Sequence, residues 1–379
     1  MKIVFATDSL KGTIDSRKAA EILTKAAENS FPKAVCVGVC IADGGEGTVE
    51  SVLEATASEK RTVYVHGPLD EKVAASYAII DQKQAVIEMA EAVGMTKIDT
   101  RRSRLGSRTS KGLGEMILDA LNQNIRDIVI GIGGSATNDG GMGAMEALGV
   151  RFLDERNRCL PGCGDFLSKV YHIDESGLDV RLKECRIRVM SDVDNRICGD
   201  EGPVMMFGTQ KGASEEEKQT LEEGMRWYAE KLTQHFQTDV FCLKSGGAAG
   251  GMGAALQLFL KAEVCSGITM LLSLVQFENI IQDADLVITG EGRIDGQSHH
   301  GKAVSGIARL CKKHQVPVVV LAGSRGEGAE AIYEDGVTAI VTAQQKNATE
   351  EELVKKAEEW YQNAAESLFR LLALGKQLS

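Results

Sequence analysis

Short apolar runs that end in segments rich in glycine and aspartate recur along this chain, and they constrain its fold more than any other feature. The runs alternate with stretches of helical periodicity, which is typical of parallel sheets. Glycines after a strand let backbone N–H groups approach anionic oxygens, because no Cβ stands in the way. Five such segments are present: residues 8–12, 43–47, 131–143, 191–195 and 289–295. Since open α/β sheets bind ligands in the loops that follow their strands, the pattern predicts a phosphate-handling enzyme.

The two ends of the chain carry matching α/β patterns. Strands are predicted at 2–7 and 34–41, each followed by a helical pattern, the first with Ser16 as its cap. The same alternation returns in the last hundred or so residues. There the predicted strands are 284–289, 316–322 and 339–341, and the predicted helices are 304–314, a segment near 327–335 and a long C-terminal helix.

A chain of 379 residues exceeds the size at which one core stops growing, so two domains are expected. The fold class predicted is α/β. Both ends build a discontinuous Rossmann-like parallel-sheet domain, residues 1–69 and 283–379, and residues 70–282 form an inserted second α/β domain. The insert has predicted strands at 85–89, 127–132 and 186–190 and a helix at 113–121. A ligand cleft is expected between the two domains.

The whole-chain charge and the cysteines narrow the partners and the compartment. A formal net charge of -11 without a lysine-rich stripe disfavours nucleic acid and anionic membrane surfaces as partners. Nine scattered cysteines in a chain without a signal peptide indicate free thiols in a reducing compartment. No apolar stretch approaches the roughly 20 residues that a membrane span needs. The expected location is therefore cytoplasmic, and homo-oligomer formation is left open.

Two familiar phosphate motifs compete for the glycine-rich loops. Residues 131–136 satisfy the relaxed dinucleotide pattern G-x-G-x-x-A after a strand, which taken alone suggests a dehydrogenase. However, Asp139 and two further glycines stand where a helix should begin against the pyrophosphate. Residues 296–303 fit seven places of a P-loop, but Ala303 replaces the hydroxyl residue that binds Mg²⁺. Lys302 at a helix N-terminus remains a candidate phosphate ligand.

A third interpretation takes the loops together. Several acidic residues follow apolar runs, so a subset of them can hold Mg²⁺ with the phosphates of a substrate while basic residues face the anions. The acidic set is Asp43, Glu46, Asp139, Asp192, Glu291 and Asp295, and the basic set is Lys11, Arg293, Lys211 and Lys302. Residues 245–254 add a glycine-rich loop before an apolar helix. That loop is either an N–H nest for an anion or a close-packed helix start.

Taken in order, these segments resemble those of the type I glycerate kinases, also called glycerate 2-kinases, nearly end to end. The matching segments are residues 8–13, 42–48, 133–141, 191–193, 207–213, 248–251 and 285–292. Two departures are visible: Asn195-Arg196-Ile197 stands where Asn-Pro-Leu is expected, and Thr209 stands where proline is expected. Both put the shape of a loop in doubt more than its chemistry.

The resemblance implies ATP- and Mg²⁺-dependent phosphorylation of D-glycerate, usually at the C2 hydroxyl, in a two-domain α/β enzyme. Its catalytic residues are predicted to be Asp192, Asp43 and Lys11. Its metal ligands are predicted to be Asp43, Asp192, Glu291 and Asp295. Its nucleotide-binding residues are predicted to be Gly133, Gly134, Ser135, Asn138, Asp139, Gly250, Gly251, Glu291, Arg293 and Lys302.

Two rival functions stay open at this point. One is a kinase that gives 3-phosphoglycerate or acts on another small hydroxy acid. The other is a sensor that binds a sugar acid without catalysis. The sequence shows neither a helix-turn-helix with a basic recognition helix nor a linker to an effector domain. Both absences count against the sensor.

Overall fold

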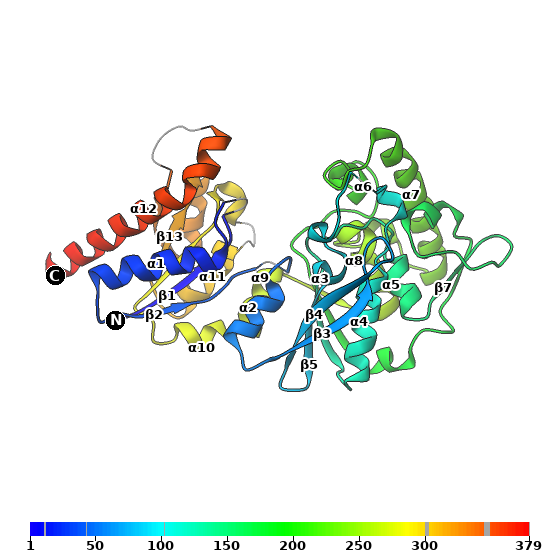
Figure 1. Ribbon diagram of the computed structural model, residues 1–379, viewed down its shortest axis with the longest axis horizontal. Helices are drawn as coiled ribbons and strands as arrows, with labels where there is room; N and C mark the ends of the chain where they lie inside the picture. The colour runs from blue at the N-terminus through cyan, green and yellow to red at the C-terminus, as the bar shows by residue number, and fades with distance from the viewer. Residues whose placement is uncertain (11–12, 43, 102, 300–302, 345–348, 379) are drawn as a thin grey trace. The chain divides into compact units, whose positions relative to one another are not determined.

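The protein is described by a computed structural model that covers residues 1–10, 13–42, 44–101, 103–299, 303–344 and 349–378. The chain forms two compact units, which are described separately (Figure 1). Unit 1 comprises Met1–Asp43, Glu50–Ala55 and Ile268–Ser379. Unit 2 comprises Gly44–Val49 and Thr56–Gly267. The α/β class with parallel-sheet domains is confirmed.

Unit 1 is built on a five-stranded, fully parallel sheet with the strand order β15-β13-β11-β1-β2. The strands are β1 (Lys2–Thr7), β2 (Val35–Gly38), β11 (Leu286–Gly290), β13 (Val318–Ala322) and β15 (Val337–Thr342). This is the doubly wound order in which the chain changes direction between the first and third strands. That switch point lies between β1 and β11, and it joins the two ends of the chain as the sequence predicts.

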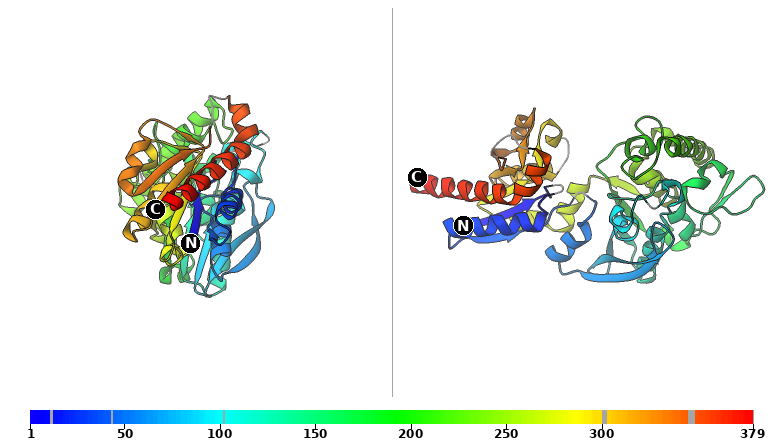
Figure 2. Two further views of the ribbon diagram at one scale, coloured as in Figure 1. Left: turned by 90° about the vertical axis from the view of Figure 1, so that its left-hand side faces the viewer. Right: turned by 45° about the horizontal axis from the view of Figure 1, so that its top comes forward.

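Two long helices cover one face of this sheet. Helices α1 (Ser16–Ser30) and α12 (Glu350–Leu378) lie side by side (Figure 2). Their apolar residues, such as Leu23 and Phe369, pack with Ile3 and Phe5 of β1 in one buried cluster. Helix α11 (Ala303–Lys313) packs against β1, β11 and β13. The other elements of the unit are α9 (Gly267–Leu274), α10 (Phe277–Ile281), β12 (Arg293–Ile294), η6 (Gly296–His299), α11 (Ala303–Lys313), β14 (Ser324–Arg325) and η7 (Ala329–Asp335).

The predicted cap of α1 is wrong by one residue. Asp15 is the N-cap, and its side chain accepts a hydrogen bond from the backbone N–H of Lys18. Ser16 is instead the first helical residue, and its Oγ donates to the Thr7 carbonyl over 2.6 Å. Both residue types cap helices well, so the sequence alone does not separate them.

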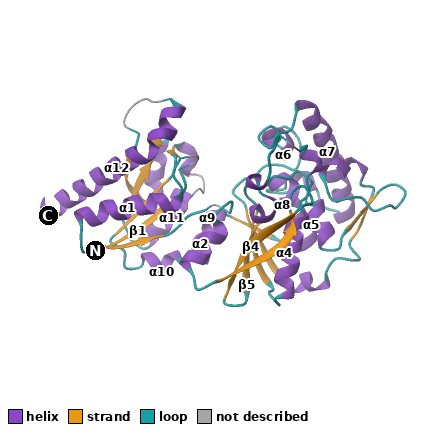
Figure 3. Ribbon diagram, viewed as in Figure 1, coloured by secondary structure: helices purple, strands orange, loops and turns teal. Residues whose placement is uncertain are grey.

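Unit 2 contains a six-stranded sheet with the order β10-β9-β6-β5-β4-β3. Figure 3 draws its strands, among them β4 and β5, in orange. The strands β5 (Gln84–Glu88), β6 (Asp127–Gly131), β9 (Arg186–Met190) and β10 (Glu263–Cys265) are parallel. An antiparallel pair, β3 (Glu59–His66) and β4 (Lys72–Ile80), completes the sheet on the β5 side.

The limits of the compact units differ from the predicted boundaries at 69/70 and 282/283. Strand β3 lies before residue 70, yet it pairs with β4 along its whole length and belongs to unit 2. Helices α9 and α10 lie before residue 283, yet residues from Ile268 onward belong to unit 1. Helix α2 (Thr48–Ala55) begins in unit 2 and ends in unit 1. The boundaries are therefore set by pairing partners distant in sequence.

The helices of unit 2 pack around its sheet in a single core. Leu113 and Met116 of α4 (Lys111–Asn122) and Met252 of α8 (Ala248–Leu260) belong to the same buried cluster as Ile87 and Ile130 of the central strands. The remaining elements are α3 (Met89–Val93), η1 (Met95–Lys97), η2 (Leu105–Ser107), α4 (Lys111–Asn122), α5 (Met142–Ala147), β7 (Arg151–Leu153), η3 (Gly164–Lys169), β8 (His172–Asp174), η4 (Val180–Glu184), α6 (Pro203–Phe207), α7 (Glu215–Phe236), η5 (Val240–Cys242) and α8 (Ala248–Leu260). Among the residues described, no helix has both the length and the apolar character to cross a membrane.

Candidate active site

The carboxyl ends of the parallel strands in unit 2 stand level with one another. The register pairs Glu88 with Gly131, Gly131 with Met190, and Met190 with Cys265. The loops that follow therefore start from one edge of the sheet. This is the edge at which open α/β sheets bind ligands.

The segment Gly44–Val49 also reaches this edge. The N–H of Gly133 donates to the carbonyl of Gly44 over 3.0 Å. Gly44 has a φ of +87°, and a Cβ on it would lie 2.7 Å from the Cβ of Met190. A Cβ on Gly133 would lie 2.7 Å from the Cα of Gly45. Only glycines permit two backbones to approach so closely. Asp43, predicted to be a metal ligand and catalytic residue, lies outside the described residues.

Glu88 is a buried carboxylate at the same edge that the sequence analysis missed. Its Oε2 accepts a hydrogen bond from the Val49 N–H over 3.2 Å, at the start of α2. Burial raises its pKa to about 7, although this hydrogen bond opposes the shift. The sequence did carry a signal for this residue, because Glu88 is the one charged residue within the otherwise apolar strand predicted at 85–89. A carboxylate there holds the Gly44–Val49 segment on the sheet edge.

The loop after β6 is shaped by Asp139. This residue is fully buried, and its Oδ2 accepts hydrogen bonds from the N–H and Oγ of Ser110, each over 2.7 Å. The N–H groups of Gly141 and Gly143 donate to its two oxygens over 3.0 and 3.2 Å. Burial raises the pKa of Asp139, and these hydrogen bonds oppose the shift. Because both oxygens are already engaged, we assign Asp139 a positioning role behind the predicted nucleotide-binding residues.

The dinucleotide fingerprint at 131–136 does not have the structure that it requires. After β6 ends at Gly131, the next helix, α5, begins only at Met142. A pyrophosphate site of that type needs the helix to start within the glycine motif. The dehydrogenase interpretation therefore loses its structural basis.

The glycine-rich segment at the start of α8 packs directly on this loop. Ala249, Gly250 and Gly251 all have left-handed backbone, with φ of 53°, 73° and 93°. A Cβ on Gly250 would lie 2.4 Å from the Thr137 carbonyl oxygen, and the Gly140 N–H donates to the Gly250 carbonyl over 2.9 Å. Ala249 is not a glycine, so its left-handed conformation is strained, as is common at functional sites.

Two asparagine side chains near this packing contact have no hydrogen-bond partner among the described residues. Both amide atoms of Asn138, which is fully buried, and of Asn195, which is 7% exposed, lack a partner within that part of the chain. A Cβ on Gly247 would lie 2.8 Å from the Nδ2 of Asn195. Unpaired buried amides are costly, and they concentrate where a structure is completed by something else.

Asp192, the predicted catalytic carboxylate, is exposed in the loop after β9. Its Oδ1 accepts a hydrogen bond from the Gly267 N–H over 2.9 Å. In the same loop, the Ser191 N–H donates to the Cys265 carbonyl over 3.1 Å. The loops after β9 and β10 are thus tied together, and one oxygen of Asp192 is held in place.

In unit 1, the predicted residues gather near the switch point between β1 and β11. The Asp8 N–H donates to the Gly290 carbonyl over 2.9 Å, and Glu291 follows directly. The hydroxyls of Thr7 and Thr289, both fully buried, have no partner in the described residues. Beyond them, Arg293 forms an ion pair of 3.6 Å with Asp295. Lys11 and Lys302, predicted to face anions, lie outside the described residues, as do two residues preceding Lys302 in the near-match to a P-loop.

The predicted site residues therefore divide between the two units. Unit 2 holds Gly133, Gly134, Ser135, Asn138, Asp139, Asp192, Gly250 and Gly251, and unit 1 holds Glu291, Arg293 and Asp295. Within the residues that the structure covers, no three His, Cys, Asp or Glu side chains gather as a metal site. The role of each predicted residue stays a prediction.

Comparison with known proteins shows which proteins this chain is similar to. A sequence profile described as the glycerate kinase family matches residues 3–373. The chain is 43% identical over 376 residues to the glycerate 2-kinase of Escherichia coli (strain K12), with 99% of each chain covered. It is 41% identical to the glycerate kinase of Bacillus cereus (strain ATCC 10987 / NRS 248), with 97% of each chain covered. A crystal structure assigned to glycerate kinase 2 of Salmonella typhimurium LT2 is similar with a TM-score of 0.82 and 40% identity, covering 100% of this chain and 99% of that one.

Proposed function

Because the chain belongs to the glycerate kinase family, we propose that it transfers a phosphoryl group from ATP to D-glycerate, at the C2 hydroxyl, giving 2-phosphoglycerate and ADP. The observation that carries this proposal is the family match along residues 3–373, and the name of the Escherichia coli relative supports the C2 position. The small-molecule partners are then D-glycerate and ATP. The free thiols of all nine cysteines agree with the cytoplasm as the proposed location.

Phosphoryl transfer asks a protein for in-line positioning and for groups that offset charge on the transferred oxygens. We assign Asp192 to the reacting hydroxyl, because it is an exposed carboxylate at the carboxyl edge of a parallel sheet. In that role its carboxylate accepts the hydroxyl proton of D-glycerate or orients that hydroxyl. Asp43 and Lys11 are proposed to assist it, as the sequence analysis predicts.

The nucleotide is proposed to bind through backbone N–H groups of the glycine-rich loops and through basic side chains. In unit 2 the residues concerned are Gly133, Gly134, Ser135, Asn138, Gly250 and Gly251, with Asp139 holding the loop in shape. In unit 1 the basic residues are Arg293 and Lys302, and the carboxylate of Glu291 is proposed to act at the same nucleotide site through the metal ion. The predicted cleft between domains, in which these sets would act together, stays part of the proposal.

The donor chemistry of the predicted ligands suits Mg²⁺. Asp192, Glu291 and Asp295 offer carboxylate oxygens. Among the described residues, no three His, Cys, Asp or Glu side chains lie close enough together to hold a metal by themselves. Mg²⁺ is commonly held by one or two carboxylates together with substrate phosphates and water, so a dense protein cage is not required. When bound, the ion offsets charge on the phosphates. We propose Asp43, Asp192, Glu291 and Asp295 as the residues that would hold it.

Phosphorus NMR of the product formed from ATP and D-glycerate tests the reaction and its position together. The proposal expects 2-phosphoglycerate and an equal amount of ADP. A resonance of 3-phosphoglycerate would overturn the C2 assignment. ADP formed faster with tartronate than with glycerate would overturn the substrate. Binding of glycerate without any ADP would favour the sensor.

A further inference from the structure

Two cationic side chains are buried against the inner side of the loop that follows β6. The Nζ of Lys211 donates to the Ser135 hydroxyl over 3.0 Å and to the Thr137 carbonyl over 2.7 Å. Arg108 donates from one guanidinium nitrogen to the Ala136 carbonyl over 3.0 Å. Lys211 is 7% exposed and Arg108 is fully buried. Two cations thus support three consecutive residues of this loop.

Neither cation forms an ion pair with a carboxylate in the described part of the chain. The other hydrogen bonds of Arg108 go to the hydroxyl and carbonyl of Ser103. The negative groups that act on them are Asp139, which acts on Lys211, and Glu217, which acts on Arg108. Asp139 is itself engaged by Ser110, Gly141 and Gly143. A buried cation without a close counter-charge is costly, so burial favours the neutral form of Lys211 until a counter-charge arrives.

The same loop carries unsatisfied polar atoms, which is an independent observation. The hydroxyl of Thr137 and both amide atoms of Asn138 are buried without a hydrogen-bond partner among the residues described. Gly133 is partly exposed and Gly134 is exposed, so the outer side of the loop is open. Its inner side therefore faces two basic side chains, and its glycine end is open to a ligand.

We propose that residues 133–138 form an oxyanion-binding site, with Arg108 and Lys211 as positioning residues whose charge the bound anion neutralises. The inference rests on the proposed function, since the anion is then the carboxylate of D-glycerate or a phosphate of ATP. Both ligands present the same chemistry, a negatively charged oxygen that accepts N–H donors. Arg108 and Lys211 act through the loop rather than by touching the ligand.

The protonation state of Lys211 should change when an anion binds to the loop. Burial, together with the charge of Arg108, lowers the pKa of Lys211 to about 7, and Asp139 opposes the shift. An anion bound on the loop favours the charged lysine and raises that pKa. At pH 8 the free protein holds Lys211 largely neutral, so binding takes up as much as about one proton. If the anion raises the pKa by about two units, binding at pH 8 takes up about 0.8 proton and is about tenfold tighter than binding to a neutral residue.

The test is calorimetric titration of the full-length protein at pH 8 in two buffers of different ionisation enthalpy, neither of them phosphate. D-glycerate and a non-hydrolysable ATP analogue are titrated separately. The wild-type protein should take up protons with one of the two ligands. Uptake with D-glycerate assigns the carboxylate to the loop, and uptake with the analogue assigns a phosphate.

Three variants separate the lysine from other groups. Lys211→Arg keeps a permanent charge and should bind up to about tenfold more tightly than wild type at pH 8, with no uptake from this site. Lys211→Met should bind roughly tenfold more weakly, also without that uptake. Lys218→Met is the control, because Lys218 is equally buried at 7% exposed but pairs with Glu215 over 3.0 Å. That variant should take up protons as wild type does.

Thermal unfolding of each variant shows whether it is folded before it is titrated. Wild-type binding of both ligands without proton uptake would overturn the inference, and that measurement needs no variant. Equal uptake by wild type and Lys211→Met would overturn it as well. ADP formation from glycerate with no uptake leaves the proposed function standing and removes only this site. Proton uptake without ADP formation leaves this site standing and removes the proposed function.

Discussion

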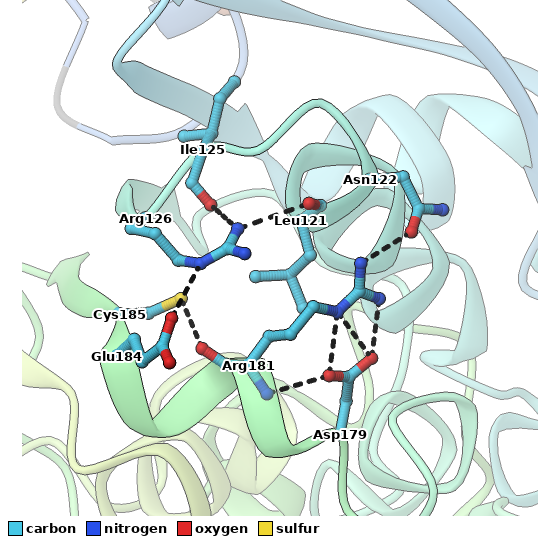
Figure 4. Close-up of polar contacts among 8 residues, drawn as sticks. All are labelled: Leu121, Asn122, Ile125, Arg126, Asp179, Arg181, Glu184 and Cys185. Carbon is cyan, nitrogen blue, oxygen red and sulfur yellow. Dashed lines mark hydrogen bonds and ion pairs between the residues drawn. The ribbon is translucent and has the colours of Figure 1, made fainter.

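The two ends of the six-stranded sheet in unit 2 treat charge in opposite ways. At the amino end, where β6 and β9 begin, charged side chains are partly exposed and paired close by (Figure 4). Arg181 binds Asp179 over 2.7 Å and Asn122 over 2.9 Å, and Arg126 lies 3.5 Å from Glu184. At the carboxyl end, Lys211 is buried beside hydroxyl and carbonyl oxygens instead.

This contrast separates charges that fasten a fold from charges that prepare a site. An exposed pair is screened by water and costs little to maintain, so it is a common structural device. A buried charge without a close partner costs stability, and such charges persist where a ligand completes them. Four predictions test this division, beginning with the largest effect.

Replacing Asp192 with asparagine should have the largest consequence. If its carboxylate handles the hydroxyl proton of the substrate, kcat should fall by ~10²–10⁴-fold while the fold is kept. A coupled assay of ADP release measures this. The matched control is Asp200→Asn, which makes the same change at an exposed residue of the same connection and should leave kcat close to wild type. Equal rates for Asp192→Asn and wild type would remove Asp192 from the mechanism.

Asp139→Ala should produce the largest loss of stability. It leaves the donors of Ser110, Gly141 and Gly143 buried and unpaired, so the free energy of unfolding should fall by about 3–5 kcal/mol. Urea unfolding followed by circular dichroism measures it. Asp174→Ala, at an exposed ion pair with Arg151, is the control and should lose only a fraction of that value. Similar losses in the two variants would contradict the positioning role of Asp139.

Glu88→Gln should change how stability depends on pH. Burial raises the pKa of Glu88 from 4.5 to about 7, so the folded protein binds this proton more tightly than the unfolded chain. Its stabilising contribution is complete below pH 4.5 and is lost as the pH rises through 7. The slope is at most about 1.4 kcal/mol per pH unit. The difference in unfolding free energy between wild type and Glu88→Gln should therefore fall between pH 5 and 7.5. A constant difference would show that Glu88 is not a buried acid.

Arg181→Ala should have the smallest effect. Its partner Asp179 is only two residues away, and its side chain is 34% exposed. The melting temperature should drop by less than about 3 °C, and ADP release should stay within about twofold of wild type. Differential scanning calorimetry and the coupled assay measure the two quantities. A loss of activity well beyond about twofold, with a melting temperature lowered by less than about 3 °C, would mean that the amino end of the sheet also serves the reaction.

The sequence by itself determined the parallel strands and the places of the loops that follow them. The apolar runs 127–132 and 186–190 became β6 and β9 within one residue, because burial on both faces leaves a local apolar signature. The glycines at 133, 250 and 251 were found for a similar reason, since close backbone approach demands a residue without Cβ, and Gly134 has a φ of +70° that favours glycine. The family resemblance was readable because these local segments recur in a fixed order.

Only the tertiary structure decided which of these residues meet and in what state of charge. The boundary of unit 2 lies before β3 and not at residue 70, because β3 forms a hairpin with β4 and so belongs to the same sheet. The burial of Glu88, the full engagement of Asp139 and the contact of Lys211 with Ser135, 76 residues earlier, depend on residues that are distant in sequence. Local patterns carry no information on such neighbours, and the neighbours fix burial and pKa.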